Sequence, residues 1–266
     1  MTVIAVLGLG EAGRIYARDL RAAGFRVRGF DPYVRADDDQ VDSVQEAVAA
    51  ADVVISLAGA RAAEGVARQA LPHCRERAVY ADLNTGSPAL KRTLAELARA
   101  AGVAFADVAV LAPVPRRGAG TPLMVAGPGA ARFAELVGPA AVPVEVIPGG
   151  AGAAAARKLL RSVFMKGLAA LMLECESAAE AAGEREWLRG QIVGELSGDA
   201  GQLVDRLIDG SREHAARRVH EVEDAAEYLA ELGRPAWVMR ASRSWLASLL
   251  APEPQDRQPL DHEEEA

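Results

Sequence analysis

The stretch VIAVLGLGEAGRIYARDL, residues 3–20, decides which fold the rest of the chain is expected to adopt. It opens with an apolar run typical of a buried strand and continues, after three glycines, with a pattern typical of a helix. Gly8, Gly10 and Gly13 stand between these two elements at the G-x-G-x-x-G spacing. Because a preceding strand and a following helix are the context that this motif requires, the stretch predicts a dinucleotide-binding loop.

Each residue of the loop has an expected role in binding a dinucleotide. Gly8 allows the tight turn, Gly10 lets the backbone approach a pyrophosphate, and Gly13 lets the helix pack closely on the strand. Glu11 and Ala12 begin the helix, whose free N–H groups and partial positive charge favour phosphate. These five residues are therefore the predicted cofactor-binding residues of the loop.

Asp31 follows Gly13 by eighteen residues, at the end of the second predicted strand. An acidic residue there accepts hydrogen bonds from the adenosine ribose and repels a 2′-phosphate, so Asp31 favours NAD over NADP. Two alternatives stay open. Asp31 can cap its own loop instead, and Arg35, four residues further on, can bind the additional phosphate of NADP.

Short apolar runs alternate with alanine-rich helical patterns from residue 2 to about residue 148. This alternation is typical of βα units around a largely parallel sheet, so we expect an α/β fold with a doubly wound sheet of the Rossmann type. Strands are predicted near residues 2–8, 25–31, 52–59, 78–84, 103–112, 121–127 and 144–148. Helices are predicted between them, near residues 11–23, 43–50, 62–70, 88–101 and 129–137.

The composition changes abruptly after Pro148. The alanine-rich residues that follow predict one helix of more than thirty residues, and no strand pattern comes after it. Further helices are predicted near 184–196, 199–232, with Gly210 as a candidate break, and 235–250. We therefore expect a Rossmann domain over residues 1–150, an all-helical substrate and dimerisation domain over 151–251 and a disordered acidic tail over 252–266.

Charge and cysteine content exclude several classes of protein. The formal net charge is −7, but residues 252–266 hold six acids against one arginine, so the folded part is nearly neutral and no basic patch indicates nucleic acid. Cys74 and Cys175 lie far apart, so no metal site is expected, and they fit a reducing compartment. Without a signal peptide pattern or a membrane-spanning run, we expect a cytoplasmic protein with no membrane partner.

The long helix is apolar on more than one side. Its apolar positions include Leu159, Val163, Leu168, Leu171 and Met172, which form more than one amphipathic stripe. About a hundred helical residues form only a small core alone. We therefore expect this part to pack against the first domain or a second subunit, and we predict a homodimer through the helical domain.

Five motifs of the chain resemble, in order, those of the 6-phosphogluconate and β-hydroxyacid dehydrogenase superfamily. They are GLGEAG, DVVISLAGA, DLNTGSP, DVAVLAPVPRRGAGTPLMVAG and GAAAARKLL. The chain looks most similar to a poorly characterised branch with a shortened C-terminal helical domain. The resemblance implies an NAD(P)-dependent oxidoreductase that interconverts an alcohol and a carbonyl in a small polar or acidic metabolite.

Lys158 matches the lysine that is the general acid/base in the better-known members of this superfamily. A lysine in an apolar wall loses hydration, and Arg157 and Arg161 place like charge beside it, so its pKa is expected to fall. The alternative is an ordinary solvated lysine on a helix surface. Lys158, Ser162 and Lys166 are four residues apart in turn, so they share one stripe that is expected to face the cofactor crevice.

Four residues are candidate substrate contacts, each with an open structural alternative. Ser162 lies on the stripe of Lys158, and Lys166 can bind an anionic group or extend along a subunit contact. Ser87 can contact substrate or cap the helix after it. His214 can reach substrate from a partner's helical domain or belong to a charged surface. Asn84, after a predicted strand, is expected near the nicotinamide ribose.

Two departures from the superfamily pattern keep other functions open. The better-known members hold the substrate carboxylate with a Ser-Gly-Gly turn, which residues 111–113 replace with Leu-Ala-Pro, and Ser162 stands where they have an asparagine. Imine reductases share the architecture, although they commonly have an acid or tyrosine at the position of Lys158. The remaining alternative is an NAD(P)-binding protein without catalytic activity.

Overall fold

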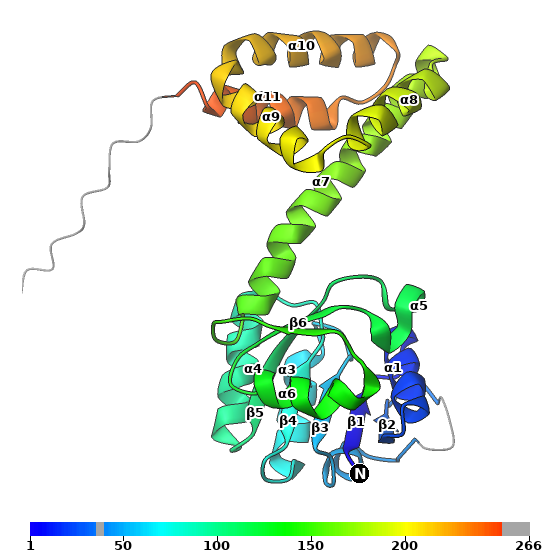
Figure 1. The fold of residues 1–266 in the computed structure, drawn as a ribbon, viewed down its shortest axis with the longest axis vertical. Helices are drawn as coiled ribbons and strands as arrows, with labels where there is room; N and C mark the ends of the chain where they lie inside the picture. Colours follow the sequence, from blue (N-terminus) through cyan, green and yellow to red (C-terminus); the bar gives the residue numbers. More distant parts are fainter. Residues whose placement is uncertain (36–39, 252–266) are drawn as a thin grey trace, which may run out of the picture. The chain divides into compact units, whose positions relative to one another are not determined.

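The computed structural model describes residues 1–35 and 40–251 and forms two compact units (Figure 1). The first unit, Met1–Val163, has strands and helices, and the second, which begins at Phe164, is helical. This confirms the expected fold class. The unit boundary falls within the long helix, whose first turns belong to the first unit. The predicted tail, residues 252–266, lies outside the described residues.

The seven predicted strands form one sheet in the first unit. They are β1 (Val3–Leu7), β2 (Arg26–Phe30), β3 (Val53–Ser56), β4 (Val79–Asp82), β5 (Ala104–Val110), β6 (Leu123–Ala126) and β7 (Val144–Val146). The order is β2-β1-β3-β4-β5-β6-β7, and neighbouring strands are parallel except β5 and β6. Because β2 and β3 lie on opposite sides of β1, the chain reverses its direction of winding there. Ligands of open α/β sheets bind at the carboxyl ends of the strands at such a point.

Helices follow most strands of the first unit. They are α1 (Glu11–Ala22), α2 (Val44–Val48), α3 (Ala63–Ala70), α4 (Pro88–Ala100), α5 (Val114–Arg117) and α6 (Ala130–Val137), with 3₁₀ turns η1 (Leu71–His73), η2 (Gly118–Gly120) and η3 (Gly138–Ala140). One buried cluster contains Tyr16 and Phe133, and a second contains Tyr80, Leu94 and Phe105. The sheet therefore has an apolar core on each face, as a doubly wound fold requires.

The second unit consists of helices alone in the part of the chain that the structure describes. They are α7 (Ala153–Ala182), which begins in the first unit, α8 (Arg185–Leu196), α9 (Ala200–Glu213), α10 (Ala215–Glu231) and α11 (Trp237–Ser248). The expectation of more than thirty residues for α7 is slightly wrong, because it has 30 and is followed by Gly183 at a φ of 76°.

The predicted helix over 199–232 is interrupted at His214 and not at Gly210. Gly210 continues α9, and a side chain there would meet the Arg218 guanidinium at 2.9 Å. Arg218 Nη1 donates to Ser211 Oγ at 2.7 Å, so this guanidinium occupies the space beside the glycine. Gly210 leaves room for this guanidinium, and a single glycine inside a helix costs only about 1 kcal/mol, which α9 tolerates.

The second unit buries little apolar surface. The hydrophobic clusters of the described residues all lie in the first unit. Large apolar side chains of α7 to α11 are instead exposed, among them Phe164, Leu173, Trp187, Trp237 and Trp245. None of the helices within residues 1–35 and 40–251 is both long and apolar enough to cross a membrane.

Candidate functional site

The glycine loop between β1 and α1 is tightly packed at two of its three glycines. Gly8 has a φ of 95°, and a Cβ there would lie 2.7 Å from backbone atoms of Leu57 and Ala58. A Cβ on Gly13 would lie 1.9 Å from the carbonyl oxygen of Gly8. Backbone atoms cannot move aside as a flexible side chain can, so both positions require glycine.

Gly10 differs from its neighbours because it faces open space. A Cβ there would meet no atom of the described residues within 4 Å. Gly10 is also the N-cap of α1, where no side chain in the described part of the chain caps the helix. Glu11 is exposed and Ala12 half-buried at this helix start. An open cradle at a helix N-terminus is the geometry that a pyrophosphate needs, so these residues fit a dinucleotide.

Asp31 holds the loop together from the end of β2. Its Oδ2 accepts a hydrogen bond from the Leu9 amide at 2.8 Å, and its Oδ1 accepts from the amides of Tyr33 and Val34 at 2.8 and 3.1 Å. This is the capping arrangement that the sequence left open. Arg35 has an exposed side chain, and its Nη1 lies 3.3 Å from Asp42 Oδ1.

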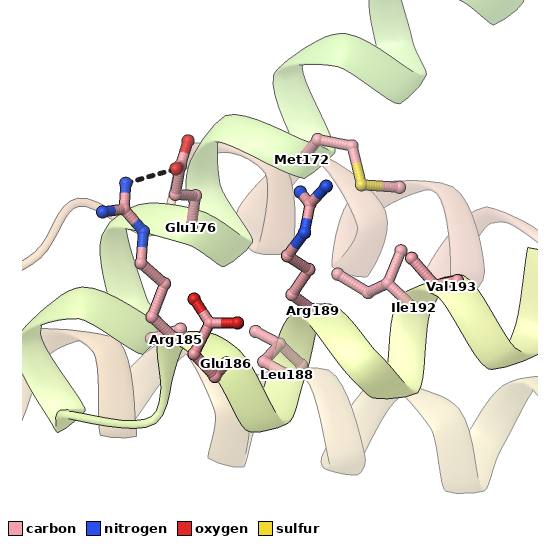
Figure 2. Close-up of a pocket in the computed structure, with 9 residues that line it drawn as sticks. Met172, Glu176, Arg185, Glu186, Leu188, Arg189, Ile192 and Val193 are labelled. Atoms are coloured by element: carbon pink, nitrogen blue, oxygen red, sulfur yellow. Dashed lines mark hydrogen bonds and ion pairs between the residues drawn. The ribbon is translucent and has the colours of Figure 1, made fainter.

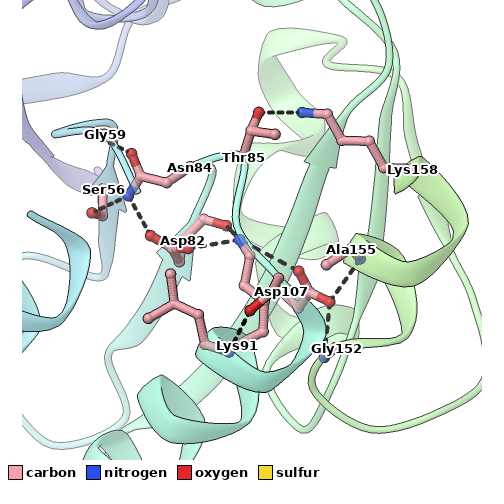
Figure 3. A network of polar contacts seen from close by, with 12 residues as sticks. Ser56, Gly59, Asp82, Asn84, Thr85, Lys91, Asp107, Gly152, Ala155 and Lys158 are labelled. Carbon is pink, nitrogen blue, oxygen red and sulfur yellow. Dashed lines mark hydrogen bonds and ion pairs between the residues drawn. The ribbon is translucent and has the colours of Figure 1, made fainter. Parts of the chain in front are cut away.

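Asn84 lies just beyond the carboxyl end of β4 and is only 5% exposed. Its Oδ1 accepts from the Gly59 amide at 2.6 Å, and its Nδ2 donates to Ser56 Oγ at 3.0 Å and to Asp82 Oδ1 (Figure 3). These bonds connect the segments that follow β3 and β4. The side chain expected at the nicotinamide ribose therefore organises this edge of the sheet.

Lys158 extends from the second turn of α7 toward the same edge. Its Nζ donates to Thr85 Oγ1 at 2.8 Å, and Thr85 is the neighbour of Asn84 (Figure 3). Burial is the largest cause of a lowered pKa of Lys158, and the charge of Lys91 lowers this pKa further while Asp107 raises it. Arg157 and Arg161, which the sequence suggested as the neighbouring charges, have exposed side chains.

Sequence reasoning missed the buried charges beside this site. Lys91 of α4 is 1% exposed, and Asp82 and Asp107 are fully buried. A signal was available, because Lys91 precedes Leu94 and Ala98 at the three- and seven-residue spacing of the buried face of α4. A lysine on such a face needs a buried partner, and the acids within the apolar strands β4 and β5 are its partners.

The other predicted substrate residues lie in different places. Ser87 is the N-cap of α4, where its Oγ accepts from the Leu90 amide at 3.1 Å. Ser162 is half-buried on α7 in the first unit, whereas Lys166 is exposed and belongs to the second. His214 separates α9 from α10, and its Nε2 lies 3.8 Å from Glu213 Oε1. The first unit thus brings Lys158 to the loop that carries Asn84, and Lys166 and His214 are described only within the second.

A pocket of about 490 Å³ lies between α7 and α8 in the second unit (Figure 2). Its apolar lining includes Met172, Leu188 and Ile192, and at its rim Arg185 forms an ion pair with Glu176. None of the residues predicted from sequence to bind cofactor or substrate is among the residues that line it.

The doubly wound sheet and the open glycine loop define an NAD-binding domain of the dehydrogenase type. A sequence profile of the NAD-binding domain of 6-phosphogluconate dehydrogenase matches residues 3–137, and a profile of a domain of unknown function matches residues 179–249. The chain belongs to the 6-phosphogluconate dehydrogenase superfamily, as its motifs predicted.

Three solved structures are similar over most of their length. A conserved hypothetical protein from Sinorhizobium meliloti is 32% identical, with 97% of this chain and 92% of that chain covered and a TM-score of 0.61. A conserved protein of unknown function, described as similar to 3-hydroxyacid dehydrogenases, is 25% identical, covering 94% and 100%, with a TM-score of 0.61. An imine reductase from Streptomyces aurantiacus is 20% identical, covering 93% and 94%, with a TM-score of 0.79, which shows a shared fold.

Proposed function

We propose that this protein is an NAD-dependent oxidoreductase that interconverts an alcohol and a carbonyl in a small polar or acidic metabolite, with Lys158 as the general acid/base. The observation that carries the proposal is the bond from Lys158 Nζ to Thr85 Oγ1 at 2.8 Å, at the edge of the sheet where the glycine loop lies. A partly dehydrated lysine at that edge suits proton transfer.

The first unit would hold the dinucleotide at Gly8, Gly10, Glu11, Ala12 and Gly13. The open space at Gly10 and the uncapped start of α1 support this assignment. Asp31 supports NAD over NADP, because its carboxylate at the end of β2 repels an additional phosphate. When bound, the nicotinamide supplies the acceptor or donor of the hydride.

Lys158 takes the hydroxyl proton in oxidation and returns it in reduction. Burial and Lys91 lower its pKa, so the neutral amine that oxidation needs forms at a lower pH than in an ordinary lysine. The kcat/KM of oxidation should therefore rise with pH through this pKa, and that of reduction should fall through the same pKa. Thr85 Oγ1 accepts a hydrogen bond from the ammonium group and so orients it.

Residues near Lys158 are proposed to contact the substrate. Ser162 lies one turn after Lys158 and Ser87 lies in the loop after Thr85, so both can supply a hydroxyl. Lys166 and His214 stay candidates for an anionic group of the substrate. Leu111 and Pro113, in place of the Ser-Gly-Gly turn that the superfamily resemblance implies, argue against the carboxylate-binding mode of the better-known members.

A panel of hydroxyacids, aldehydes and cyclic imines, followed at the nicotinamide absorbance, tests the proposal. Lys158→Met should lower kcat by roughly 10²- to 10⁴-fold, the usual contribution of a general acid/base. Arg157→Met removes an exposed cation from the adjacent position and should leave kcat unchanged. Full activity in Lys158→Met would refute the catalytic assignment.

An imine reductase is the second candidate. The likeness of fold to the Streptomyces aurantiacus imine reductase and the absence of a serine from residues 111–113 support it. Turnover of cyclic imines without turnover of carbonyls or alcohols would favour this candidate. Cofactor binding without turnover of any compound on the panel would favour a catalytically silent NAD(P)-binding protein.

We further propose that the protein is a homodimer through its helical unit. Phe164 and Leu173 of α7 are 62% and 67% exposed, and Trp245 of α11 is 75% exposed. Large apolar side chains exposed in this number support an association site in this unit. Free Cys74 and Cys175 fit a reducing, cytoplasmic setting.

Sedimentation analysis at micromolar concentration tests the dimer. Leu173→Asp places a charge in the proposed contact and should halve the measured mass. Tyr33→Asp makes the same kind of change at a 94% exposed side chain of the first unit and should leave the mass unchanged. A monomeric mass for the unaltered protein would contradict the dimer.

A further inference from the structure

Three buried charges form a network in the first unit, close to Lys158. Lys91 Nζ donates to Asp82 Oδ2 at 2.6 Å and to the Asp82 carbonyl oxygen at 2.7 Å (Figure 3). It also lies 3.5 Å from Asp107 Oδ1, and all three side chains are at most 1% exposed. Burial of three charges is costly and needs a reason beyond packing, because apolar residues of the same volume are often as stable.

Asp107 connects this network to the helix that carries Lys158. Its Oδ2 accepts hydrogen bonds from the amides of Gly152 and Ala155, at 2.9 and 3.0 Å, at the start of α7. Lys158 follows Ala155 by three residues, which is about one helical turn. The carboxylate that pairs with Lys91 therefore also holds the first turn of α7.

Asp82 connects the network to the loop that receives Lys158. Its Oδ1 accepts from Asn84 Nδ2, and Thr85 follows Asn84 in the chain. Thr85 in turn accepts the hydrogen bond of Lys158. The network thus supports both the helix that supplies the ammonium group and the loop that orients it.

We propose that Lys91 is a positioning residue for the proton transfer assigned to Lys158: bound between Asp82 and Asp107, it fixes the surroundings of the Lys158 ammonium and adds a buried like charge to them. The proposal rests on the proposed function. Lys91 touches neither the reacting atoms nor the ammonium group in this role, and it acts on the reaction through Lys158.

The charges that act on Lys158 come from several elements. Lys91 of α4 lowers the pKa of Lys158, after burial, and Asp107 of β5 raises it. Asp82 of β4 is bonded to Lys91, and Arg157 and Arg161, on the helix of Lys158 itself, have exposed side chains. Because Lys91 and Asp107 act in opposite directions, their removal has opposite predicted effects.

The proton affinity of Lys158 can be measured without a substrate. Trace acetylation by acetic anhydride modifies only the neutral amine, and mass spectrometry of the peptide that contains Lys158 gives its rate at each pH. In the native protein, the midpoint of this pH dependence should lie below that of the same lysine in the urea-unfolded chain. Equal midpoints would overturn the proposal without recourse to any variant.

Two variants separate electrostatic tuning from structural support. Asp107→Asn keeps an oxygen for the amides of Gly152 and Ala155 but removes the negative charge, so the neutral amine should be several-fold more abundant at a given pH. The double variant Lys91→Met/Asp82→Asn removes one charge of each sign, and the loss of the like charge should make the neutral amine several-fold scarcer. Arg92→Met removes an exposed charge from the same helix and should change nothing.

The two variants are expected to shift the acetylation midpoint in opposite directions, and this difference is the decisive observation. If the network were merely structural, both variants would admit water to Lys158 and both midpoints would rise. A rise or no change in Asp107→Asn therefore overturns the proposal. If that variant does not fold, as circular dichroism would show, an unchanged midpoint in the double variant overturns it, and if neither folds, a native midpoint equal to that of the unfolded chain overturns it.

The reaction itself supplies a separate readout. The pH profile of kcat/KM should shift in each variant in the direction of its acetylation midpoint. If Lys158→Met keeps full activity, the proposed function fails whatever the midpoints show. If Lys158→Met is inactive but the midpoints do not move in opposite directions, the proposed function stands and the role of Lys91 fails.

Discussion

The two units of this chain differ in how they bury their side chains. The first unit has an apolar cluster on each face of its sheet and encloses even charged groups such as Lys91. The second unit leaves large side chains of its helices exposed, among them Leu173 and Trp245. The first unit therefore has the interior of a self-sufficient domain, whereas the second has the exposed apolar surface on which the proposed dimer depends.

The sharpest test of this difference compares two helical glycines. Gly13→Ala would place a Cβ 1.9 Å from the Gly8 carbonyl oxygen in the densely packed first unit. We expect this variant to lose more than ~4 kcal/mol of unfolding free energy and to lose NADH binding. Gly190→Ala, on α8 of the second unit, meets no described atom within 4 Å and should stabilise by about 0.5–1 kcal/mol.

Urea unfolding and a fluorescence titration with NADH measure both effects. Unchanged stability of Gly13→Ala would show that the loop is not packed as described. If Gly190→Ala instead destabilised the protein, this result would indicate that a neighbouring chain packs directly on α8.

The next largest expected effect is the loss of stability when the cation of an ion pair is removed, which we compare between the two units. Lys91→Met leaves two buried carboxylates without their cation and should cost roughly 3–5 kcal/mol. Arg206 forms a 2.6 Å pair with Glu195 in the second unit, but both side chains are more than 60% exposed. Arg206→Met should therefore cost less than about 1 kcal/mol. Equal losses in urea unfolding would contradict the distinction between a buried and an exposed network.

The smallest expected difference between the two units is in the reactivity of their cysteine thiols. Burial raises the pKa of Cys74, in the first unit, to about 11, so its thiolate forms only at high pH. At pH 8 its alkylation by iodoacetamide should be on the order of a hundred-fold slower than in the urea-unfolded chain. Burial also raises the pKa of Cys175, in the second unit, where we expect weaker protection. Equal protection, measured by mass spectrometry, would show that the second unit is as well covered as the first.

The elements that sequence predicted well are those with a local signal. The strands of the sheet and the helices α1, α4 and α6 follow from apolar periodicity and from glycine or serine at their ends. The break at His214 was missed because Gly210 is the stronger local signal. Only the folded chain shows that α9 continues through Gly210, with the Arg218 guanidinium beside it.

The residues of the candidate site also differ in whether a local sequence signal reveals their role. The glycine loop was predicted because its function depends on the spacing of adjacent residues. The role of Asp31 was left open between ribose and loop, since its bond to the Leu9 amide joins residues 22 apart. Lys91 was missed because its partners are on two strands, and a side chain's burial depends on every element packed around it.

The sequence by itself determined the α/β fold, the helical second part, the dinucleotide loop and the superfamily, because each depends on periodicity or on motifs of consecutive residues. Only the tertiary structure decided what surrounds Lys158. Thr85 accepts a hydrogen bond from that lysine in a loop, and the charges of Lys91 and Asp107 act on it from a helix and a strand. The proton affinity of the group depends on the burial and the distances that this packing creates, and neither quantity is encoded by spacing along the chain.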